Sequence, residues 1–329
     1  MNLLKSILPT LLLMMGLFGC VGANVTLFTD ASDPLMEVTL EGSADDKILV
    51  VPVVGVINDR PDDKFMRTMP SPVQEVVSQL RLAEEDKNIK AVIFKIDSPG
   101  GTTTASDILY HEIAAFKERS GKKVVVCMMN VVASGGYYIS LPADLIVAHP
   151  TTVTGSVGVI LVTPQISEVM EKIGVDMRVH KSGENKDMGS PFRDPTAEEE
   201  RILQQVADSL GQRFVQLVKE HRKLGEKRLA LVADARVFLA EDALDVGLVD
   251  KIGYLPDAIE ETKTMGSIDA DARIVAYRRT QYPDDNIYYT LNSSAANGPK
   301  PLMDMGPIAD WLSLRAGFYY IWPNALGAR

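Results

Sequence analysis

Four apolar segments rich in β-branched residues constrain the fold of this chain more than any other feature. They lie at residues 48–57, 91–96, 124–129 and 145–148. Continuous apolar runs, as opposed to alternating ones, are typical of strands that helices cover on both faces of a parallel sheet. Patterns of helical spacing separate these runs. The sequence therefore predicts an α/β fold with a largely parallel β-sheet, flanking helices and right-handed crossovers.

Capping residues and apolar spacing predict the helices. Ser71-Pro72 begins one helix, and the capping box at 196–199 begins the longest, which is expected to end at Gly225. The remaining expectations are helices at 106–119, 164–173 and 241–246, a strand at 176–180, a loop at 181–195 and an alternating strand-like piece at 273–277.

The N-terminal residues 1–20 have the layout of a secretory signal: a basic start, a short apolar run with a proline, and a cysteine at its end. This ending resembles a lipoprotein signal, which makes Cys20 the expected lipid attachment site. An uncleaved anchor and a plain cleaved signal remain alternatives. We expect residues 21–47 to be a linker or N-terminal segment, 48–260 to be the main domain, and 261–329 to be a C-terminal extension of open role.

Composition narrows the possible functions. The formal net charge is −10 and no basic stripe occurs, which argues against a nucleic-acid partner. The two cysteines and four histidines show no metal-ligand spacing. No cofactor and no metal are therefore expected.

Two glycine-rich turns follow predicted strands. In Val131–Tyr138, Ser134 stands at the start of a short helix and is followed by two glycines. Free backbone N–H groups at such a point can bind a developing oxyanion. The second turn, Asp97–Thr102, leaves room for a substrate backbone to come close. Ser134 is thus the candidate nucleophile, although close helix packing would also explain small residues at either turn.

The residues alone leave two kinds of base open for activating this serine. None of the four histidines has a clear aspartate partner, and they are His111, His149, His180 and His221. A lysine is the other choice, if burial lowers its pKa from about 10.4 toward ~7–8. The loop after residue 179 offers Lys181 and Lys186.

Five motifs in order resemble the signal peptide peptidase A family, in its half-length type. They are Ser98-Pro-Gly-Gly101, Ala133–Tyr138, Thr154-Gly-Ser-Val-Gly158, Lys181–Asp187 and Ala243–Gly253. The resemblance implies a ClpP/crotonase-like fold and a serine endopeptidase with a Ser/Lys dyad. By motif, it makes Ser134 the nucleophile, Lys186 the general base and Ser156 the hydroxyl that positions the lysine. Gly101 and Gly135 would then supply the oxyanion N–H groups.

The resemblance also implies peptide substrates, such as remnant signal peptides or unfolded membrane-proximal protein, and a homo-oligomeric ring. One protomer's lysine would then serve its neighbour's serine. With the N-terminal signal, we expect a bacterial cell-envelope protein that is anchored to the membrane, with its catalytic domain outside the cytoplasm. A catalytically silent membrane scaffold of the same fold and, less favoured, an acyl-CoA enzyme are the alternatives.

Overall fold

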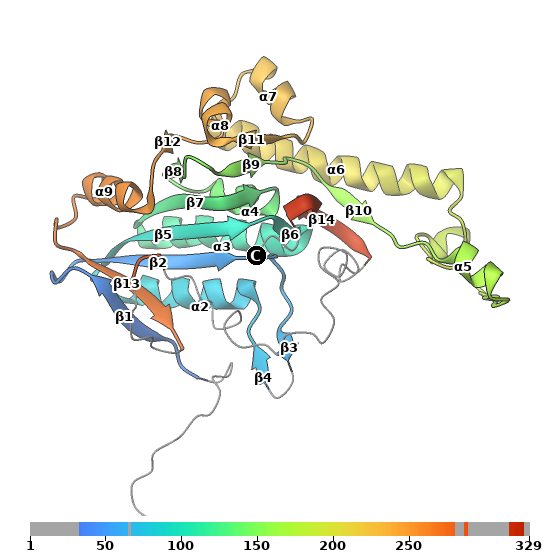
Figure 1. Ribbon diagram of the computed structural model, residues 1–329, viewed down its shortest axis with the longest axis horizontal. Helices are drawn as coiled ribbons and strands as arrows, with labels where there is room; N and C mark the ends of the chain where they lie inside the picture. Colours follow the sequence, from blue (N-terminus) through green and yellow to red (C-terminus); the bar gives the residue numbers. More distant parts are fainter. Residues whose placement is uncertain (1–32, 65–66, 280–285, 289–315, 326–329) are drawn as a thin grey trace, which may run out of the picture.

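A large, mostly parallel sheet forms the centre of the molecule (Figure 1). The computed structural model describes residues 33–64, 67–279, 286–288 and 316–325. Among them, nine strands form this sheet in the order β1-β13-β2-β5-β7-β8-β12, with β9 beside the end of β7 and β11 beside β9. Only the β1–β13 and β11–β9 pairs are antiparallel. The predicted α/β fold with a largely parallel sheet is confirmed.

The strands of this sheet are β1 (Met36–Glu41), β2 (Lys47–Val54), β5 (Ile89–Ser98), β7 (Lys123–Ala133), β8 (Leu145–Ala148), β9 (Val153–Gly155), β11 (Val237–Leu239), β12 (Lys251–Ile252) and β13 (Arg273–Arg278). A smaller sheet joins β6 (Gly100–Thr102), β14 (Gly317–Ile321) and β10 (Ile160–Val162), and β3 (Asp62–Lys64) pairs with β4 (Arg67–Met69).

The helices are α2 (Pro72–Glu85), α3 (Thr103–Ser120), α4 (Gly135–Ser140), α5 (Ser167–Lys172), α6 (Ala197–Arg222), α7 (Glu226–Val232), α8 (Ala240–Val246) and α9 (Leu255–Gly266), with 3₁₀ turns η1 (Glu184–Asp187) and η2 (Pro323–Ala325). Both predicted N-terminal caps are confirmed, whereas α6 ends at Arg222 with Lys223 as its C-cap, and the predicted end at Gly225 is the N-cap of α7. Ser71 accepts a hydrogen bond from the Gln74 N–H at 3.1 Å, and both halves of the Thr196–Glu199 capping box form.

Alternate residues of the central strands pack into two different cores, which explains their continuous apolar sequences. In β5, Val92 and Phe94 face the larger core with α2 and α3, while Ala91 and Ile93 face the smaller core with α9. Because helices cover both faces, neither face of these strands requires polar residues. The sheet positions the site by bringing the carboxyl ends of β5, β7 and β9 together.

Strands outside residues 48–260 also join the central sheet. β13 inserts between β1 and β2, pairing in parallel with Lys47–Leu49. β1, within the segment expected to be a linker, is the edge strand beyond it. Among the described residues, pairing of β2 with β13 stops at Leu49, so Pro52 lies beyond the paired part of that edge, where a missing N–H is tolerated.

Residues 163–195, which we call the arm, extend away from the central sheet together with the N-terminal end of α6 (Figure 1). The predicted helix at 164–173 forms as the shorter α5. The predicted strand at 176–180 is wrong, because these residues are exposed and form no regular structure. Apolar and polar residues alternate here as they do in a strand, but among the described residues no neighbouring strand pairs with this segment.

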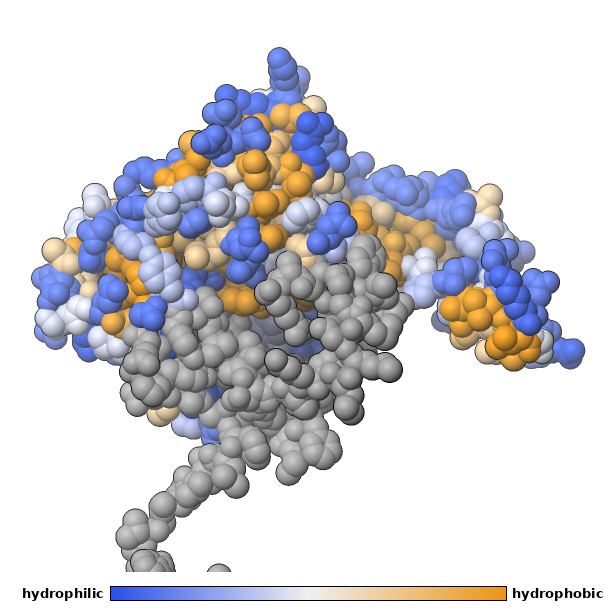
Figure 2. Space-filling model, viewed as in Figure 1, coloured by the Kyte–Doolittle hydropathy of each residue, from blue (hydrophilic) through white to orange (hydrophobic). Residues whose placement is uncertain are grey.

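The arm exposes large apolar side chains, which appear as orange residues at the right of Figure 2. They are Ile166, Val169, Ile173, Val175, Met177, Val179 and Phe192, with Ile173 68% exposed. Leaving so many apolar groups in water is unfavourable. An exposed apolar patch of this kind is typical of a surface that another molecule covers.

Candidate active site

Ser134 lies at the turn between β7 and α4, in a strained backbone conformation. Its φ of 51° and ψ of −115° are rare for a residue with a side chain. Two backbone hydrogen bonds hold it there: its N–H donates to the Gly155 carbonyl at 2.8 Å, and its carbonyl accepts from Tyr138 at 2.8 Å. Strain of this kind is found where the surrounding structure fixes a functional side chain.

The Ser134 hydroxyl is fully buried and has no hydrogen-bond partner among the described residues. A buried polar group without a partner costs about 1–3 kcal/mol, so such groups are rare away from functional sites. The side chain also makes no capping hydrogen bond to α4. The hydroxyl is therefore not used for local structure and is available for chemistry.

The second glycine turn lies against the serine turn. Gly100 has a φ of +103°, and a Cβ there would come within 2.7 Å of the Gly135 nitrogen. A Cβ on Gly101 would lie 1.8 Å from the Ile57 carbonyl oxygen, and one on Gly135 would lie 3.0 Å from the Gly101 nitrogen. A residue with a side chain would therefore clash at Gly100, at Gly101 and at Gly135. The two residues predicted to supply oxyanion N–H groups, Gly101 and Gly135, are thus neighbours beside Ser134.

Ser156 lies next to the serine turn on the neighbouring strand end. β9 pairs with β7 so that Gly155 is opposite Ala133, which makes Ser156 and Ser134 the following residues of two paired strands. Ser156 is mostly buried, has a φ of +53°, and donates its N–H to the Arg236 carbonyl at 2.8 Å. Two strained serines therefore stand side by side.

Strand β14 covers the two turns. It pairs with β6 in antiparallel register, with Tyr320 opposite Gly101. A Cβ on Gly100 would lie 2.0 Å from the Tyr320 carbonyl oxygen. The Tyr320 ring stacks on Tyr138 with centroids 5.0 Å apart, and its hydroxyl donates to the Leu210 carbonyl at 2.9 Å. This strand, from the aromatic end of the chain, belongs to the core; Trp311 lies outside the described residues.

Tyrosines near the turn are donors and do not serve as bases. Burial, followed by a hydrogen bond to Asp107, raises the pKa of Tyr138. Its hydroxyl donates to the Asp107 carboxylate at 2.6 Å. Burial also raises the pKa of Tyr320 to about 12. These hydroxyls therefore stay protonated at neutral pH.

The structure separates the two candidate lysines by their contacts. Lys181 donates to the Asp187 carboxylate and to the Glu184 carbonyl, each at 2.7 Å. Lys186 is exposed in η1, and within the described parts of the chain its amine makes no hydrogen bond or ion pair. Lys186 belongs to the arm, which extends away from the central sheet (Figure 1). Gly101, Gly135 and Ser156 instead adjoin Ser134 at the ends of β6, β7 and β9.

Two of the four histidines form hydrogen bonds with residues other than Ser134. His221 shares a 2.8 Å hydrogen bond with the Tyr110 hydroxyl, and His149 shares one of 2.9 Å with Thr151. In the described ranges, no hydrogen bond joins a histidine to Ser134. This geometry does not supply a histidine-based triad within the chain.

Sequence reasoning missed Ser106, on α3, which adjoins this site. Its hydroxyl is buried without a partner in the described structure, and a Cβ on Gly135 would lie 2.4 Å from it. A polar residue on the buried face of α3 was the available signal.

Several predicted features fall outside this geometry. Cys20 lies outside the described residues, and Cys127 is a buried free thiol. Within the described residues, no group of metal-ligating side chains occurs. No helix among them is long and apolar enough to span a membrane.

A buried serine in a strained turn at the start of a helix, next to a second glycine turn, is typical of serine hydrolase sites. Comparison with known proteins agrees. The model of peptidase family S49 matches residues 116–269, and the Clp protease family model matches residues 69–149.

Similar proteins are also named as peptidases or proteases. The chain is 36% identical over 248 residues to a putative signal peptide peptidase SppA of Enterococcus faecium, covering 75% of this chain and 72% of that one. It is 31% identical to Protease 4 of Haemophilus influenzae (89% and 46%), and 33% identical to the chloroplastic serine protease SPPA of Arabidopsis thaliana (61% and 30%). The chain thus spans less than half the length of these last two relatives.

This chain belongs to peptidase family S49, the signal peptide peptidase A family. The predictions of this family, of a ClpP-like fold and of a serine protease are confirmed.

Proposed function

We propose that this chain is a serine endopeptidase in which Ser134 and Lys186 form a catalytic dyad. The observation that carries the proposal is the Ser134 hydroxyl, which is held at a strained turn beside the Gly101 and Gly135 backbone and has no partner of its own in the described structure. A nucleophile in this setting lacks only a base. Lys186 is the candidate whose amine is not engaged by a carboxylate, unlike Lys181.

The chemistry follows from these positions. The neutral Lys186 amine takes the proton of the Ser134 hydroxyl, whose oxygen attacks the peptide carbonyl. Backbone N–H groups of Gly101 and Gly135 stabilise the oxyanion of the tetrahedral intermediate. The lysine gives the proton to the leaving amine, and a water then hydrolyses the acyl-enzyme with the lysine again as base. Ser156, next to the serine turn, positions the lysine amine.

The dyad is completed between protomers of a homo-oligomeric ring. Two observations support this step: the arm carries Lys186 away from the serine turn of its own chain, and the same arm exposes a run of apolar side chains. A neighbouring protomer would cover those side chains and bring Ser134 of one subunit to Lys186 of the next.

Substrates are peptides left at the membrane, such as remnant signal peptides or unfolded membrane-proximal protein. The name of the E. faecium relative supports this class. The apolar N-terminal segment with Cys20 would hold the protein at the bacterial envelope, with the peptidase domain outside the cytoplasm. A glycine turn that pairs with an extended strand, as β6 pairs with β14, suits extended peptides.

The first test compares hydrolysis of a fluorogenic apolar peptide by the full chain and by Ser134→Ala, Lys186→Ala and Lys181→Ala. The first two variants should each lose at least about a thousandfold in rate, and by similar amounts, because a dyad acts as a unit. Lys181→Ala should retain measurable hydrolysis. The rate should rise with pH as Lys186 loses its proton, and a flat profile from about pH 6 to 10 would contradict a lysine base.

The same test separates the rival functions. Folded, assembled wild type without hydrolysis would favour the silent scaffold. Turnover of a thioester in place of the peptide would favour acyl-CoA chemistry. A matched inactive Ser134→Ala protein keeps contaminating proteases from being mistaken for this activity.

A further inference from the structure

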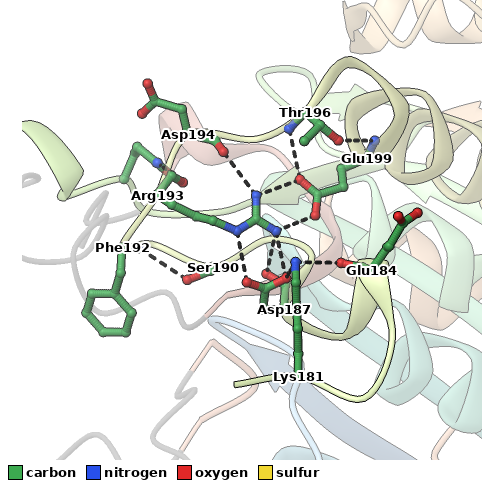
Figure 3. A network of polar contacts seen from close by, with 10 residues as sticks. Lys181, Glu184, Asp187, Ser190, Phe192, Arg193, Asp194, Thr196 and Glu199 are labelled. Carbon is green, nitrogen blue, oxygen red and sulfur yellow. Dashed lines mark hydrogen bonds and ion pairs between the residues drawn. The ribbon is translucent and has the colours of Figure 1, made fainter. Parts of the chain in front are cut away.

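Arg193 joins the loop that carries Lys186 to the start of α6 (Figure 3). Toward the loop, its Nε and Nη2 donate to the two carboxylate oxygens of Asp187 at 2.9 and 2.8 Å. Toward the helix, its Nη1 donates to Glu199 at 2.8 Å and its Nη2 donates to the other Glu199 oxygen. One guanidinium thus holds two carboxylates from different segments.

This contact uses the full donor capacity of the arginine, whose guanidinium has five N–H groups. Besides the carboxylates, Nη1 donates to the Asp194 carbonyl at 3.0 Å, and Nη2 makes a longer contact of 3.4 Å with the Asp187 carbonyl. Glu199 is in turn fixed by the capping box, since it accepts from the Thr196 N–H at 2.8 Å and is 1% exposed. Arg193 therefore anchors the loop to a rigid helix terminus.

Apart from polar contacts such as the Ile166 N–H to the Pro191 carbonyl at 2.8 Å and the Ser167 hydroxyl to Asp194 at 2.9 Å, the arm has no packed core of its own in the described structure. Among the described residues, α5 and η1 contain no buried side chains, and no strand ladder crosses residues 176–195. In η1, Asp187 directly follows Lys186, and the Lys186 N–H donates to the Gly183 carbonyl at 3.2 Å. Fixing the Asp187 side chain consequently fixes the backbone from which Lys186 projects.

Charge gives the contact a second effect. Asp187 is next to Lys186, and an unpaired carboxylate there would favour the ammonium form that cannot accept a proton. Two cations compensate it: Arg193 at 2.8 Å and Lys181 at 2.7 Å. The hydrogen bonds from Arg193, followed by the one from Lys181, lower the pKa of Asp187. The Arg193 hydrogen bonds also lower the pKa of Glu199 to about 2. The network therefore stays fully ionised wherever a lysine base could work.

We propose that Arg193 is a positioning residue for catalysis: its two-sided clamp on Asp187 and Glu199 sets the place of Lys186 and neutralises the carboxylate beside it. This inference rests on the proposed role of Lys186 as the base. The charged groups of this network are Lys181, Glu184, Asp187, Arg193 and Asp194 on the arm, and Glu199 on α6 (Figure 3). Of these acidic side chains, Asp194 is held by the Ser167 hydroxyl at 2.9 Å, and Glu184 has only its backbone carbonyl in the network.

The test uses the full chain with Arg193→Gln, Arg193→Lys and Asp187→Asn. Arg201→Gln serves as the matched control, because Arg201 makes only an exposed 3.8 Å pair with Glu198 on the same helix. For each protein, kcat and KM for the fluorogenic peptide are measured across pH, together with thermal unfolding and the size of the assembly.

Arg193→Gln should lower kcat by about 10- to 100-fold with a smaller change in KM, since misplacing a catalytic group by about 1 Å costs on that order. The pH range over which its kcat rises should also move to higher pH, because Asp187 has lost one of its two cations. Asp187→Asn should lower kcat without moving this pH range upward, because it removes the negative charge. Arg193→Lys should keep this pH range in place yet leave kcat low, since a single ammonium cannot hold two carboxylates as a planar fork does.

Two results would overturn the proposal. One is a wild-type kcat that rises over the wild-type pH range in a folded, assembled Arg193→Gln protein. The other is activity lost only in proportion to folded, assembled protein, which would assign Arg193 to stability. The dyad itself is tested separately: if Lys186→Ala keeps full activity, the proposed function fails whatever Arg193 does, whereas an inactive Lys186→Ala beside a normal Arg193→Gln rejects the clamp alone.

Discussion

The serine turn and the lysine loop are built in opposite ways. Ser134 is fully buried, directly follows the paired strands β7 and β9, and lies next to glycines that accept no side chain. Lys186 is exposed on the arm, whose α5 and η1 contain no buried side chains. The loop that carries it is held by ion pairs such as Arg193–Asp187. The position of Ser134 is thus set by the core of its own chain, and that of the Lys186 loop by surface charges.

This difference shows which half of the site can adapt to assembly. A buried turn is fixed on folding, because moving it would disrupt the central sheet. An exposed arm with apolar residues gains its final surroundings when another subunit covers it. A dyad divided between these two regions would be competent only in the assembled ring.

The largest expected effect comes from mixing inactive chains. Ser134→Ala and Lys186→Ala should each be inactive alone, yet mixed rings should recover hydrolysis. If neighbouring subunits supply the two residues at random, about a quarter of the sites become complete. Co-assembly is checked by size, and activity is measured before and after mixing under conditions that exchange subunits.

Mixed rings of the wild-type size without recovered activity would break the comparison, since each site would then be complete within one chain. Mixing Ser134→Ala with itself, taken through the same exchange procedure, controls for reactivation by the treatment.

A second prediction concerns Lys95, a buried lysine that contrasts with Lys186. Its side chain is 1% exposed in β5 and its amine donates to the Ile287 carbonyl at 2.9 Å. Burial lowers the pKa of Lys95 from 10.5 to about 8. Between these values the unfolded chain binds more protons than the folded one, so stability should rise with pH across this window. A difference of this size is on the order of 3 kcal/mol.

Urea unfolding of wild type and Lys95→Met at about pH 7, 8.5 and 10 measures this effect. The variant lacks the titrating group, so its advantage should be greatest below pH 8 and should shrink above it. Peptide hydrolysis should persist in Lys95→Met, because this amine belongs to the smaller core under α9. A pH-independent difference in unfolding free energy would show that Lys95 is not forced toward its neutral form.

A third prediction compares a glycine from each region. Gly101→Ala should destabilise the protein by about 2 kcal/mol and abolish most activity, because its Cβ would lie 1.8 Å from the Ile57 carbonyl oxygen. Gly183→Ala, in the lysine loop, meets no atom within 4 Å and should change stability by less than about 0.5 kcal/mol. Chemical denaturation of both variants measures the contrast. Equal tolerance at the two sites would mean that the serine turn is not rigid.

Local patterns in the sequence were sufficient to predict the elements that carry the serine. The β7 strand, the glycines after Ser134 and the Thr196 capping box all depend on neighbours close in sequence. The central sheet order was not accessible in this way. β13 enters between β1 and β2, and β14 crosses the glycine turn, through pairings that span more than 200 residues. No local pattern specifies such partners.

The error at residues 176–180 has a different cause. Apolar residues alternate with polar ones here as in a half-buried strand, but the apolar side chains of Val175, Met177 and Val179 are exposed. Periodicity reports that one face will be covered, and it does not say by which molecule. The position of Lys186 relative to Ser134 was unpredictable for the same reason, since the arm reaches away from its own sheet.

The smallest predicted effect tests how the buried serine becomes accessible. Tyr320→Phe removes the 2.9 Å hydrogen bond to the Leu210 carbonyl but keeps the ring that stacks on Tyr138. Losing this bond should cost about 1 kcal/mol. If substrate reaches Ser134 by local opening of β14, the open state becomes about fivefold more populated, and a fluorophosphonate should label Ser134 about fivefold faster. Tyr288→Phe, at an exposed tyrosine, is the control. Unchanged labelling in a Tyr320→Phe protein of lowered stability would mean that access to the serine does not pass through β14, and the covered turn would then have to open on another side.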